Sequence, residues 1–366
     1  MGTHPKAPSL LLNTQTPLKS ILTEANLSKG VSELYNGDLP FLFKVLSINK
    51  ALSIQAHPDK QLAQNLFAKF PDVYKDSNHK PEMALALTPF EAFIGFRPVV
   101  QIAQLLDRYP EFAAAVGPAI VAEFNQQVTQ TGVSTNKTDI QANKRVLKLL
   151  FAALMRQDPT IVASNLQTLL NRIDSSKDTL DALLKRLNAQ FPLDVGCFCA
   201  LLLNYIELQS GDAIFLAANE PHAYISGDCV ECMATSDNVV RSGLTPKFKD
   251  VDTLVDMLTY NYGPSDAQVL HGVQTSKHTK LYDPPIDEFS VAQTTLRQGD
   301  DKETVNAIEG PSVAIVTEGS GSITADGVTL AAKTGFVFFI GANQPVSFQL
   351  AADASQFVVY RAYCQL

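Results

Sequence analysis

Four side chains of this 366-residue chain have types and spacings that suit a metal ion. Gln55 and His57 lie two residues apart, so both point to one face of a predicted strand. Glu82 and His222 follow further along the chain. An amide oxygen, two imidazoles and a carboxylate make a ligand set for a borderline divalent cation such as zinc, with one position left open for water. The alternative interpretation is that these are ordinary core or surface histidines.

A second group of side chains is cationic and lies in or beside strand-like segments, near hydroxyls such as that of Ser53. A charge within an apolar run, as at Lys44, needs an anionic partner. A phosphate group is one such partner, and a salt bridge to Asp or Glu is the other. The four cations are Lys44, Lys80, Arg241 and Lys247.

Three carboxylates lie between His222 and Arg241 in the sequence. They are candidates for bases, for partners of the metal ligands or for solvated loop residues, and residue type alone does not rank them. These carboxylates are Asp228, Glu231 and Asp237.

Three zones of different composition must position these residues. The first, residues 1–97, contains short predicted strands over 41–47 and 52–56. The second, residues 98–190, has apolar side chains at helical spacing, and Asp158-Pro159 is typical of a capped helix start. From Gly196 onward, predicted strands separated by Gly, Asn and Asp favour an antiparallel sandwich or barrel. These strands cover 198–208, 213–216, 312–316, 321–325, 335–340 and 357–360.

An internal repeat occurs in this last zone. Residues 211–222 align without gaps on residues 335–346, and both copies have a turn glycine, an apolar strand and an Asn-x-Pro turn. Two copies predict two similar β-units. The first copy ends in His222 and the second in Val346, so we expect only the first unit to carry a metal-binding imidazole.

Composition excludes several classes of protein. The net charge is −8 and the pI is about 5.3, which argues against nucleic acid and anionic membrane as partners. Five cysteines, an odd number, suit a reducing compartment and predict a cytoplasmic protein. Cys197-Phe-Cys199 and Cys229-Val-Glu-Cys232 are an alternative zinc site, although the first pair lies in an apolar, strand-like run over 197–203.

Several long runs closely resemble the type I mannose-6-phosphate isomerases (phosphomannose isomerases), in order and over nearly the whole chain. Motifs of this length and unusual composition make the resemblance specific. The runs are Leu39-Pro-Phe-Leu-Phe-Lys-Val-Leu-Ser47, Leu52-Ser-Ile-Gln-Ala-His-Pro-Asp-Lys60, Asn78-His-Lys-Pro-Glu-Met-Ala-Leu-Ala-Leu-Thr-Pro-Phe90, Asn219-Glu-Pro-His-Ala-Tyr224, Gly227-Asp-Cys-Val-Glu-Cys-Met-Ala234, Arg241-Ser-Gly-Leu-Thr-Pro-Lys247 and Tyr282-Asp-Pro-Pro285.

The resemblance implies a mainly β fold, with cupin-like (jelly-roll) antiparallel barrels and an all-α insertion. Residues 1–97 and 191–265 would form the catalytic barrel, residues 98–190 the helical insertion, and residues 266–366 a C-terminal barrel without metal.

The resemblance also implies roles for individual residues. One Zn²⁺ per chain would be bound by Gln55, His57, Glu82 and His222, and Arg241 would act in catalysis. The candidates for the catalytic base are Lys80, His79, Glu231 and Asp237. The substrate and its phosphate would be bound by Lys44, Ser53, Lys247 and Tyr224.

The implied activity interconverts mannose 6-phosphate and fructose 6-phosphate by proton transfer through an enediol, and supplies mannose 6-phosphate for GDP-mannose synthesis and glycosylation. The partner is then a hexose phosphate, without nucleic acid, membrane or obligate protein partner. Family members carry a further N-terminal segment with a Trp-containing strand, whereas this chain begins Met1-Gly-Thr-His4 and has no Trp. We therefore expect weak activity or solubility, and an inactive sugar-phosphate-binding relative is the alternative. A cupin oxygenase is disfavoured, because two His and one carboxylate would not need Gln55.

Overall fold

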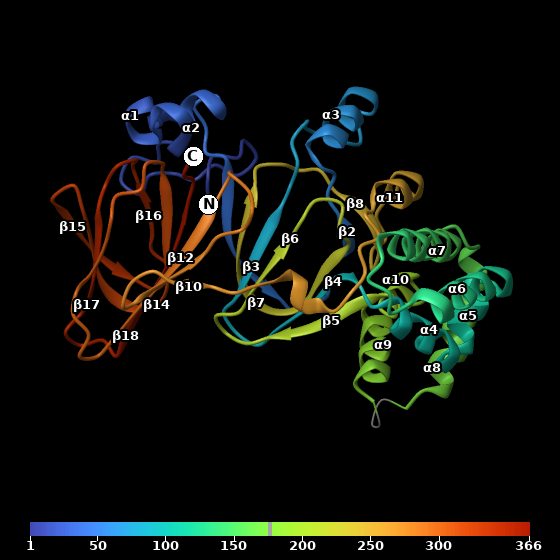
Figure 1. The fold of residues 1–366 in the computed structure, drawn as a ribbon. Helices are drawn as coiled ribbons and strands as arrows, with labels where there is room; N and C mark the ends of the chain where they lie inside the picture. The colour runs from blue at the N-terminus through green and yellow to red at the C-terminus, as the bar shows by residue number, and fades with distance from the viewer. Residues whose placement is uncertain (175–177) are drawn as a thin grey trace.

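The computed structural model describes residues 1–174 and 178–366, and its strands form two antiparallel sheets that lie side by side (Figure 1). The first sheet has nine strands in the order β5-β4-β7-β3-β6-β9, with β1 and β2 also paired to β7, and β8 to β2. Its strands are β1 (Phe41–Ile48), β2 (Ile54–Ala56), β3 (Glu82–Ala86), β4 (Phe90–Phe96), β5 (Leu203–Leu208), β6 (Ala213–Leu216), β7 (His222–Ala234), β8 (Val240–Gly243) and β9 (Val269–Leu270).

The second sheet also has nine strands, in the order β10-β11-β12-β18-β14-β17-β13, with β15 and β16 paired to β14. Its strands are β10 (Val273–Gln274), β11 (Thr279–Tyr282), β12 (Ser290–Arg297), β13 (Glu303–Val305), β14 (Ser312–Ala325), β15 (Val328–Lys333), β16 (Val337–Ile340), β17 (Val346–Leu350) and β18 (Gln356–Tyr363).

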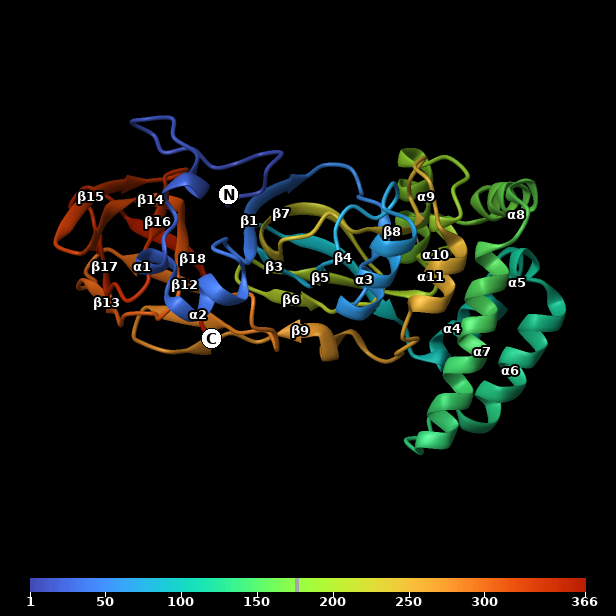
Figure 2. The ribbon, with the colours of Figure 1, turned by 90° about the horizontal axis from the view of Figure 1, so that it is seen from above.

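A group of helices is inserted between β4 and β5 and lies beyond the first sheet, at the far end of the molecule from the second (Figure 2). Asp158 caps α8 through Thr160 N, as the sequence predicts. The helices are α4 (Val99–Arg108), α5 (Pro110–Val116), α6 (Pro118–Thr131), α7 (Lys137–Met155), α8 (Pro159–Arg172), α9 (Thr179–Gln190) and α10 (Gly196–Cys199).

The remaining helices lie along the edges of the two sheets. The short helices near the N-terminus pack on the second sheet, since Leu27 and Val31 share one core with Tyr282 and Phe289. These N-terminal helices are η1 (Leu18–Ile21), α1 (Glu24–Leu27) and α2 (Lys29–Leu34). The other three are α3 (Lys60–Lys69), α11 (Val251–Met257) and η2 (Ser265–Gln268).

The prediction of a mainly β chain with two antiparallel units and a helical insertion is confirmed. The helical stripes form a core as expected: Leu150, Leu166 and Leu184 are fully buried in one cluster. No helix among the described residues is long and apolar enough to cross a membrane.

The first part of the predicted strand over 198–208, within the strand-like run 197–203, is wrong. Residues Gly196–Cys199 form the helix α10, and β5 starts only at Leu203. Asp194 Oδ1 accepts hydrogen bonds from Gly196 N at 2.7 Å and from Leu244 N at 2.6 Å, which fixes the helix start against β8. An apolar run that is buried on all sides looks the same in a helix and in a strand, so periodicity could not separate the two.

The predicted repeat has matching backbone geometry in both copies. Gly211 and Gly335 have φ of +90° and +88°, and Asn219 and Asn343 have φ of +62° and +61°. Both pairs therefore adopt the left-handed conformation that Gly and Asn tolerate best. Each copy contains a short strand, β6 or β16, and ends at the first residue of the next strand, β7 or β17.

The pairing extends this likeness to whole sheets. Strand β3 pairs with β6 and β7, and the first half of β14 pairs with β16 and β18. Strand β4 pairs with β5 and β7, and the second half of β14 pairs with β15 and β17. Strands β1 and β2 therefore correspond to β12 and β13, and β3 and β4 to the two halves of β14. Strands β5 and β6 correspond to β15 and β16, and β7 to β17 and β18 together, with the helices inserted where β14 and β15 are joined by a turn.

Candidate metal centre

Three of the four predicted ligands meet inside the first sheet. His57 follows β2, whereas Glu82 and His222 are the first residues of β3 and β7. One ligand atom from each lies within 4.8 Å of the other two. The Nε2 atoms of His57 and His222 lie 3.3 and 3.4 Å from the carboxylate oxygens of Glu82, and all three side chains are buried.

The backbone orients both imidazoles. His57 Nδ1 lies 2.6 Å from the carbonyl oxygen of Asn238, and His222 Nδ1 lies 3.0 Å from that of Glu220. A carbonyl accepts, so Nδ1 carries the proton and Nε2 presents its lone pair. Both Nε2 atoms are buried without a hydrogen-bond partner. Because an unpaired buried nitrogen is costly, this arrangement fits a metal ion between the two rings and Glu82.

Gln55 is placed beside these ligands by the sheet. It pairs with His222 on β7 and with Arg241 on β8. Its side-chain oxygen accepts a hydrogen bond of 3.2 Å from Ser53 Oγ. The fourth predicted ligand therefore lies between a metal-ligand strand and the strand that carries the predicted catalytic arginine.

The charge states in the group suit metal binding. Burial and the nearby charge of Lys80 lower the pKa of His57 to about 4, so the ring is neutral at neutral pH. Burial opposes ionisation of Glu82, but Lys80 and the two histidines outweigh it and hold its pKa well below the usual range. Lys80 Nζ lies 3.3 Å from Glu82 Oε1. The carboxylate is therefore available as an anionic ligand.

Lys44 and Glu231 form an ion pair in the same sheet. The two residues face each other across β1 and β7, with Lys44 Nζ 2.6 Å from a Glu231 oxygen. Burial opposes the charge on Lys44, but Glu231 outweighs it and raises the pKa of Lys44. Tyr224 is fully buried on the same strand as Glu231, and burial raises its pKa well above the usual value. The apolar run around Lys44 therefore does have an anionic partner within the protein.

Arg241 is half-buried on β8, and within residues 1–174 and 178–366 no side-chain hydrogen bond or ion pair of its guanidinium is seen. Lys247 lies in the exposed loop after β8, where its backbone N–H donates to Thr245 Oγ1. Both cations are free to meet an anion that is not part of the described chain.

Two further candidates are engaged elsewhere. His79 Nε2 lies 2.6 Å from an oxygen of Glu288, which precedes β12. Asp237 forms an ion pair of 2.5 Å with Lys6 and one of 3.4 Å with His4, and its side chain is exposed. Neither residue has a recorded contact with the metal group.

The alternative cysteine site does not assemble in the described part of the chain. Cys197 and Cys199 lie on α10, whereas Cys229 and Cys232 lie on β7. All are buried free thiols, and burial raises the pKa of each. A buried neutral thiol is a poor metal ligand.

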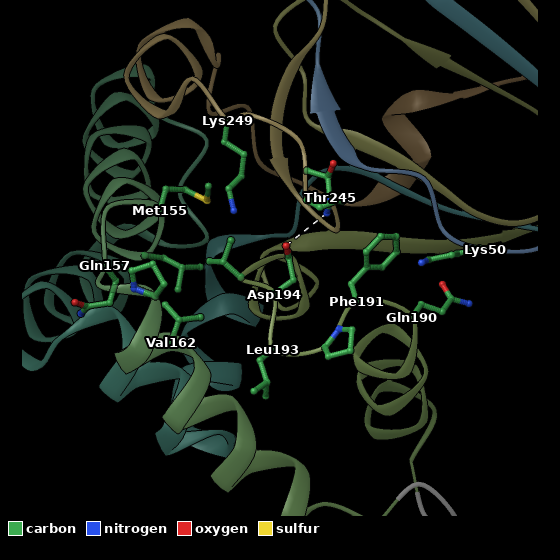
Figure 3. A pocket seen from close by; sticks show the side chains of 15 residues that line it. Lys50, Met155, Gln157, Val162, Gln190, Phe191, Leu193, Asp194, Thr245 and Lys249 are labelled. Carbon is green, nitrogen blue, oxygen red and sulfur yellow. Dashed lines mark hydrogen bonds between the residues drawn. The ribbon is translucent and has the colours of Figure 1, made fainter.

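A pocket in the described residues lies at the helical insertion and not at the metal group (Figure 3). It has a volume of about 550 Å³ and is lined by α8, the segment after α9 and the loop after β8. Phe191 and Asp194 face into it between Lys50 and Lys249. Its lining includes none of the predicted metal ligands.

Sequence analysis missed the groups that orient the ligands. Asn238 acts through its backbone carbonyl, and its side chain donates to the carbonyl oxygen of Asp76 at 2.7 Å. Glu288 lies 209 residues from its partner His79. Every residue has a backbone carbonyl, so residue type cannot show which one accepts a hydrogen bond. Two residues so far apart in the sequence form no local pattern that would predict their contact.

Comparisons with known proteins agree with this geometry. Models of the type I phosphomannose isomerase family match residues 1–99 (catalytic domain), 116–203 (helical insertion domain) and 280–328 (C-terminal). Mannose-6-phosphate isomerases from Candida glabrata and Saccharomyces cerevisiae are 46% and 44% identical to the chain, covering all of it and 88% of each relative.

Solved structures of phosphomannose isomerases have the same fold. A mutant enzyme from Salmonella typhimurium is 32% identical, with a TM-score of 0.84 over all of this chain and 90% of that one. A zinc-bound mannose 6-phosphate isomerase is 31% identical, with a TM-score of 0.82 over the same shares.

Proposed function

This chain belongs to the type I phosphomannose isomerase family, and we propose on that basis that it is a zinc-dependent isomerase of mannose 6-phosphate and fructose 6-phosphate. The observation that carries the proposal is the buried group of His57, Glu82 and His222, whose two free Nε2 atoms face one carboxylate. Relatives named for this activity and a zinc-bound structural neighbour support it.

We assign one zinc ion to His57, Glu82 and His222, with Gln55 as the fourth ligand. Catalytic zinc is typically bound by three histidine nitrogens or carboxylate oxygens, and a further ligand such as water can be exchanged for substrate. When bound, zinc supplies a Lewis acid that stabilises negative charge on the sugar oxygens. Gln55 is half-buried, on a strand that is paired with both β7 and β8.

The reaction moves one proton between neighbouring carbons. A base takes the proton from C2 of the open-chain aldose, the freed electron pair forms the C1–C2 double bond, and O1 gains a proton to give the enediol. The base then returns a proton to C1, while O2 loses its hydrogen and becomes the ketone oxygen. Arg241 has no partner within the described chain and lies beside Gln55, so its positive charge can stabilise the developing oxyanion.

Of the four candidate bases, we propose that Glu231 transfers the proton. Glu231 forms an ion pair of 2.6 Å with Lys44, and the two residues share a sheet with Glu82. Lys80 is bound to Glu82 and serves to keep that ligand ionised. His79 and Asp237 have partners outside the group.

We propose that the substrate phosphate is bound by Lys247 and Ser53. Lys247 is exposed and has no carboxylate partner among the described residues, whereas Ser53 reaches Gln55. Tyr224 and Lys44 are more enclosed, and we assign them to the sugar and to the base rather than to the phosphate. Binding energy from the phosphate then orients C1 and C2.

We propose the predicted division of the chain as its functional organisation. The first sheet holds the chemistry, the helices from 98 to 190 enclose one side, and the second sheet is an accessory unit. Strand β9 pairs with β6, so the first sheet extends past residue 265 to Leu270. Five free cysteines fit a cytoplasmic enzyme, and its product would feed GDP-mannose synthesis.

A coupled isomerase assay on the purified chain tests the function. We expect conversion of mannose 6-phosphate that a chelator abolishes and added zinc restores. Elemental analysis should find about one zinc per chain. Binding of the sugar phosphate without turnover, in a zinc-loaded protein, would favour the inactive relative instead.

Glu231→Gln tests the base with a change of one charge and little volume. We expect loss of solvent-hydrogen exchange at C2 of the substrate, with zinc content unchanged. Asp237→Asn is the matched control, because that carboxylate is exposed and bound to Lys6. Full exchange in Glu231→Gln would move the base to another residue.

A further inference from the structure

Arg361 is an unusual residue in the second sheet, because its charge is buried without a counter-ion. Its relative exposure is 3%. Nε donates to Ser312 Oγ at 2.9 Å, while Nη1 and Nη2 have no hydrogen-bond partner. No carboxylate within residues 1–174 and 178–366 forms an ion pair with it. Burying a charge without a partner is costly, so the fold keeps this guanidinium at the expense of stability.

Arg361 is one of the residues that line a cavity of about 220 Å³. Strand β18 pairs with β12 and β14 at this level, where Ala292 and Ala314 face Arg361 across the ladders. The small side chains of these two alanines leave room beside the guanidinium. The rest of the lining includes Thr279 and Thr294, whose hydroxyls lie 2.9 Å apart, and Ala307 near the surface.

Strand correspondence places this cavity where the first sheet has its metal group. Val305 pairs with Val346 at the start of β17, just as Gln55 pairs with His222 at the start of β7. Ala307 follows Val305 by two residues, as His57 follows Gln55. Both Val305 and Ala307 line the cavity.

The ligand Glu82 also has a counterpart in the second sheet. Glu82 pairs with Leu216, and Ser312 pairs with Ile340, the repeat partner of Leu216. Ser312 therefore takes the place of Glu82.

Arg361 has a counterpart in the same way. Two residues into β14, Ala314 faces Arg361, and two residues into β3, Ala84 faces Glu231. Where the first sheet buries the carboxylate Glu231, the second buries a cation instead. The buried carboxylate of Glu303 accepts a hydrogen bond of 3.1 Å from Thr279 in the cavity lining and forms no ion pair with Arg361 among the described residues.

We propose that the cavity beside Arg361 binds a small oxyanion, either phosphate or a carboxylate, at the position that corresponds to the metal centre of the first sheet. The two free Nη groups can donate a pair of parallel hydrogen bonds to two oxygens of such an anion. The volume lies below the range of roughly 300–1,000 Å³ typical of sites for larger ligands, which favours a small anion over a whole sugar phosphate.

Titration of the full-length, zinc-loaded protein with inorganic phosphate tests the site. Arg361→Met removes the charge and keeps most of the side-chain length, whereas Arg297→Met, at an exposed position on β12, is the matched control. We expect calorimetry to show a phosphate-binding event, separate from any binding at Lys247 and Ser53, that weakens at least tenfold in Arg361→Met and persists in Arg297→Met. Equal phosphate binding by both variants would overturn the proposal.

A second variant keeps the test valid if Arg361→Met does not fold. Ala307→Leu fills the cavity from an exposed position and leaves Arg361 in place. We expect the same loss of phosphate binding, and unchanged binding would contradict the site. Crystals soaked in selenate should show an anomalous peak within hydrogen-bond distance of Nη1 and Nη2, and its absence would also count against the proposal.

Two readouts separate the ligand and the proposed activity. Acetate in place of phosphate, at equal ionic strength, reports whether a carboxylate competes for the site. If the protein binds phosphate at Arg361 but lacks isomerase activity, the anion site stands and only the proposed function is refuted. If the protein has isomerase activity but no phosphate binding that depends on Arg361, the proposed function stands and the anion site is refuted.

Discussion

The two sheets share one strand plan and differ in what that plan presents to its interior. The first places an amide, two imidazoles and a carboxylate at four corresponding positions, and the second places Val305, Ala307, Ser312 and Val346 there. The turns before His222 and Val346 have nearly the same backbone conformation, since φ is +62° at Asn219 and +61° at Asn343. Chemistry in this molecule therefore depends on a few side chains and not on the β-scaffold that presents them.

The connection between two strands differs as much as the interior. In the second sheet, β14 and β15 are joined by Asp326 and Gly327, with φ of +48° and +72°. These values are typical of a tight hairpin turn. In the first sheet, β4 and β5 are joined by the whole helical insertion. A long insertion at a hairpin tip is tolerated because the entropy cost of closing a loop grows only slowly with loop length. Strands β4 and β5 still pair with each other on either side of the insertion.

The largest expected effect is loss of the metal. In His57→Ala/His222→Ala, zinc should fall from about one per chain to background, and isomerase activity should fall with it. The reason is that two of three clustered ligands are removed. Elemental analysis and the coupled assay measure both quantities.

His271→Ala is the matched control for this double variant, because His271 is exposed and outside the cluster. Zinc retained in full by the double variant would show that the metal group lies elsewhere.

Arg241→Lys should lower kcat by roughly 10²-fold while zinc and fold are kept. A lysine ammonium cannot reproduce the planar pair of donors that the guanidinium offers to an oxyanion. Steady-state kinetics and thermal unfolding measure the two effects. A loss of stability with near-normal kcat would instead make Arg241 a structural residue.

In the second sheet, Val346→Ala should destabilise by about 2 kcal/mol and leave zinc content unchanged. Val346 is fully buried in the core of that sheet, at the position where the first sheet has His222. Chemical denaturation gives the free energy of unfolding. Altered zinc binding with normal stability would contradict the correspondence between the sheets.

The smallest effect concerns the contact between the first sheet and the segment before β12. Burial opposes ionisation of Glu288, but hydrogen bonds from His79 and Lys60 lower its pKa to about 2. A lowered pKa in the folded state stabilises the protein above the unfolded pKa of 4.5, and this stabilisation is lost as pH falls towards 2.

Glu288→Gln should therefore cost about 1 kcal/mol at neutral pH, because Lys60 is exposed and water screens its share. The difference between the two proteins should vanish in acid. Unfolding measured across this pH range tests the sign, and a difference that grows in acid would refute it. Glu309→Gln, at an exposed site, is the control.

The spacing of residues in the sequence was sufficient to predict those features that depend only on residues close together in the chain. The Asp158 cap, the buried helical stripes and the two copies of the Gly–strand–Asn turn all follow from residues within one element. The chain also reveals the chemical types of the metal group, since amide, imidazole and carboxylate are few and unusually placed. In these cases the physical cause and the residue pattern lie in the same short segment.

Only tertiary structure decided the rest, because the deciding contacts join distant segments. The register of β2 with β7 and β8 brings Gln55 beside His222 and Arg241, and no local pattern fixes that register. Cys197–Cys199 forms a helix because Asp194 holds its start against β8. Arg361 looks like one more surface arginine in the sequence, and becomes a buried, unpaired cation only when β18 lies between β12 and β14.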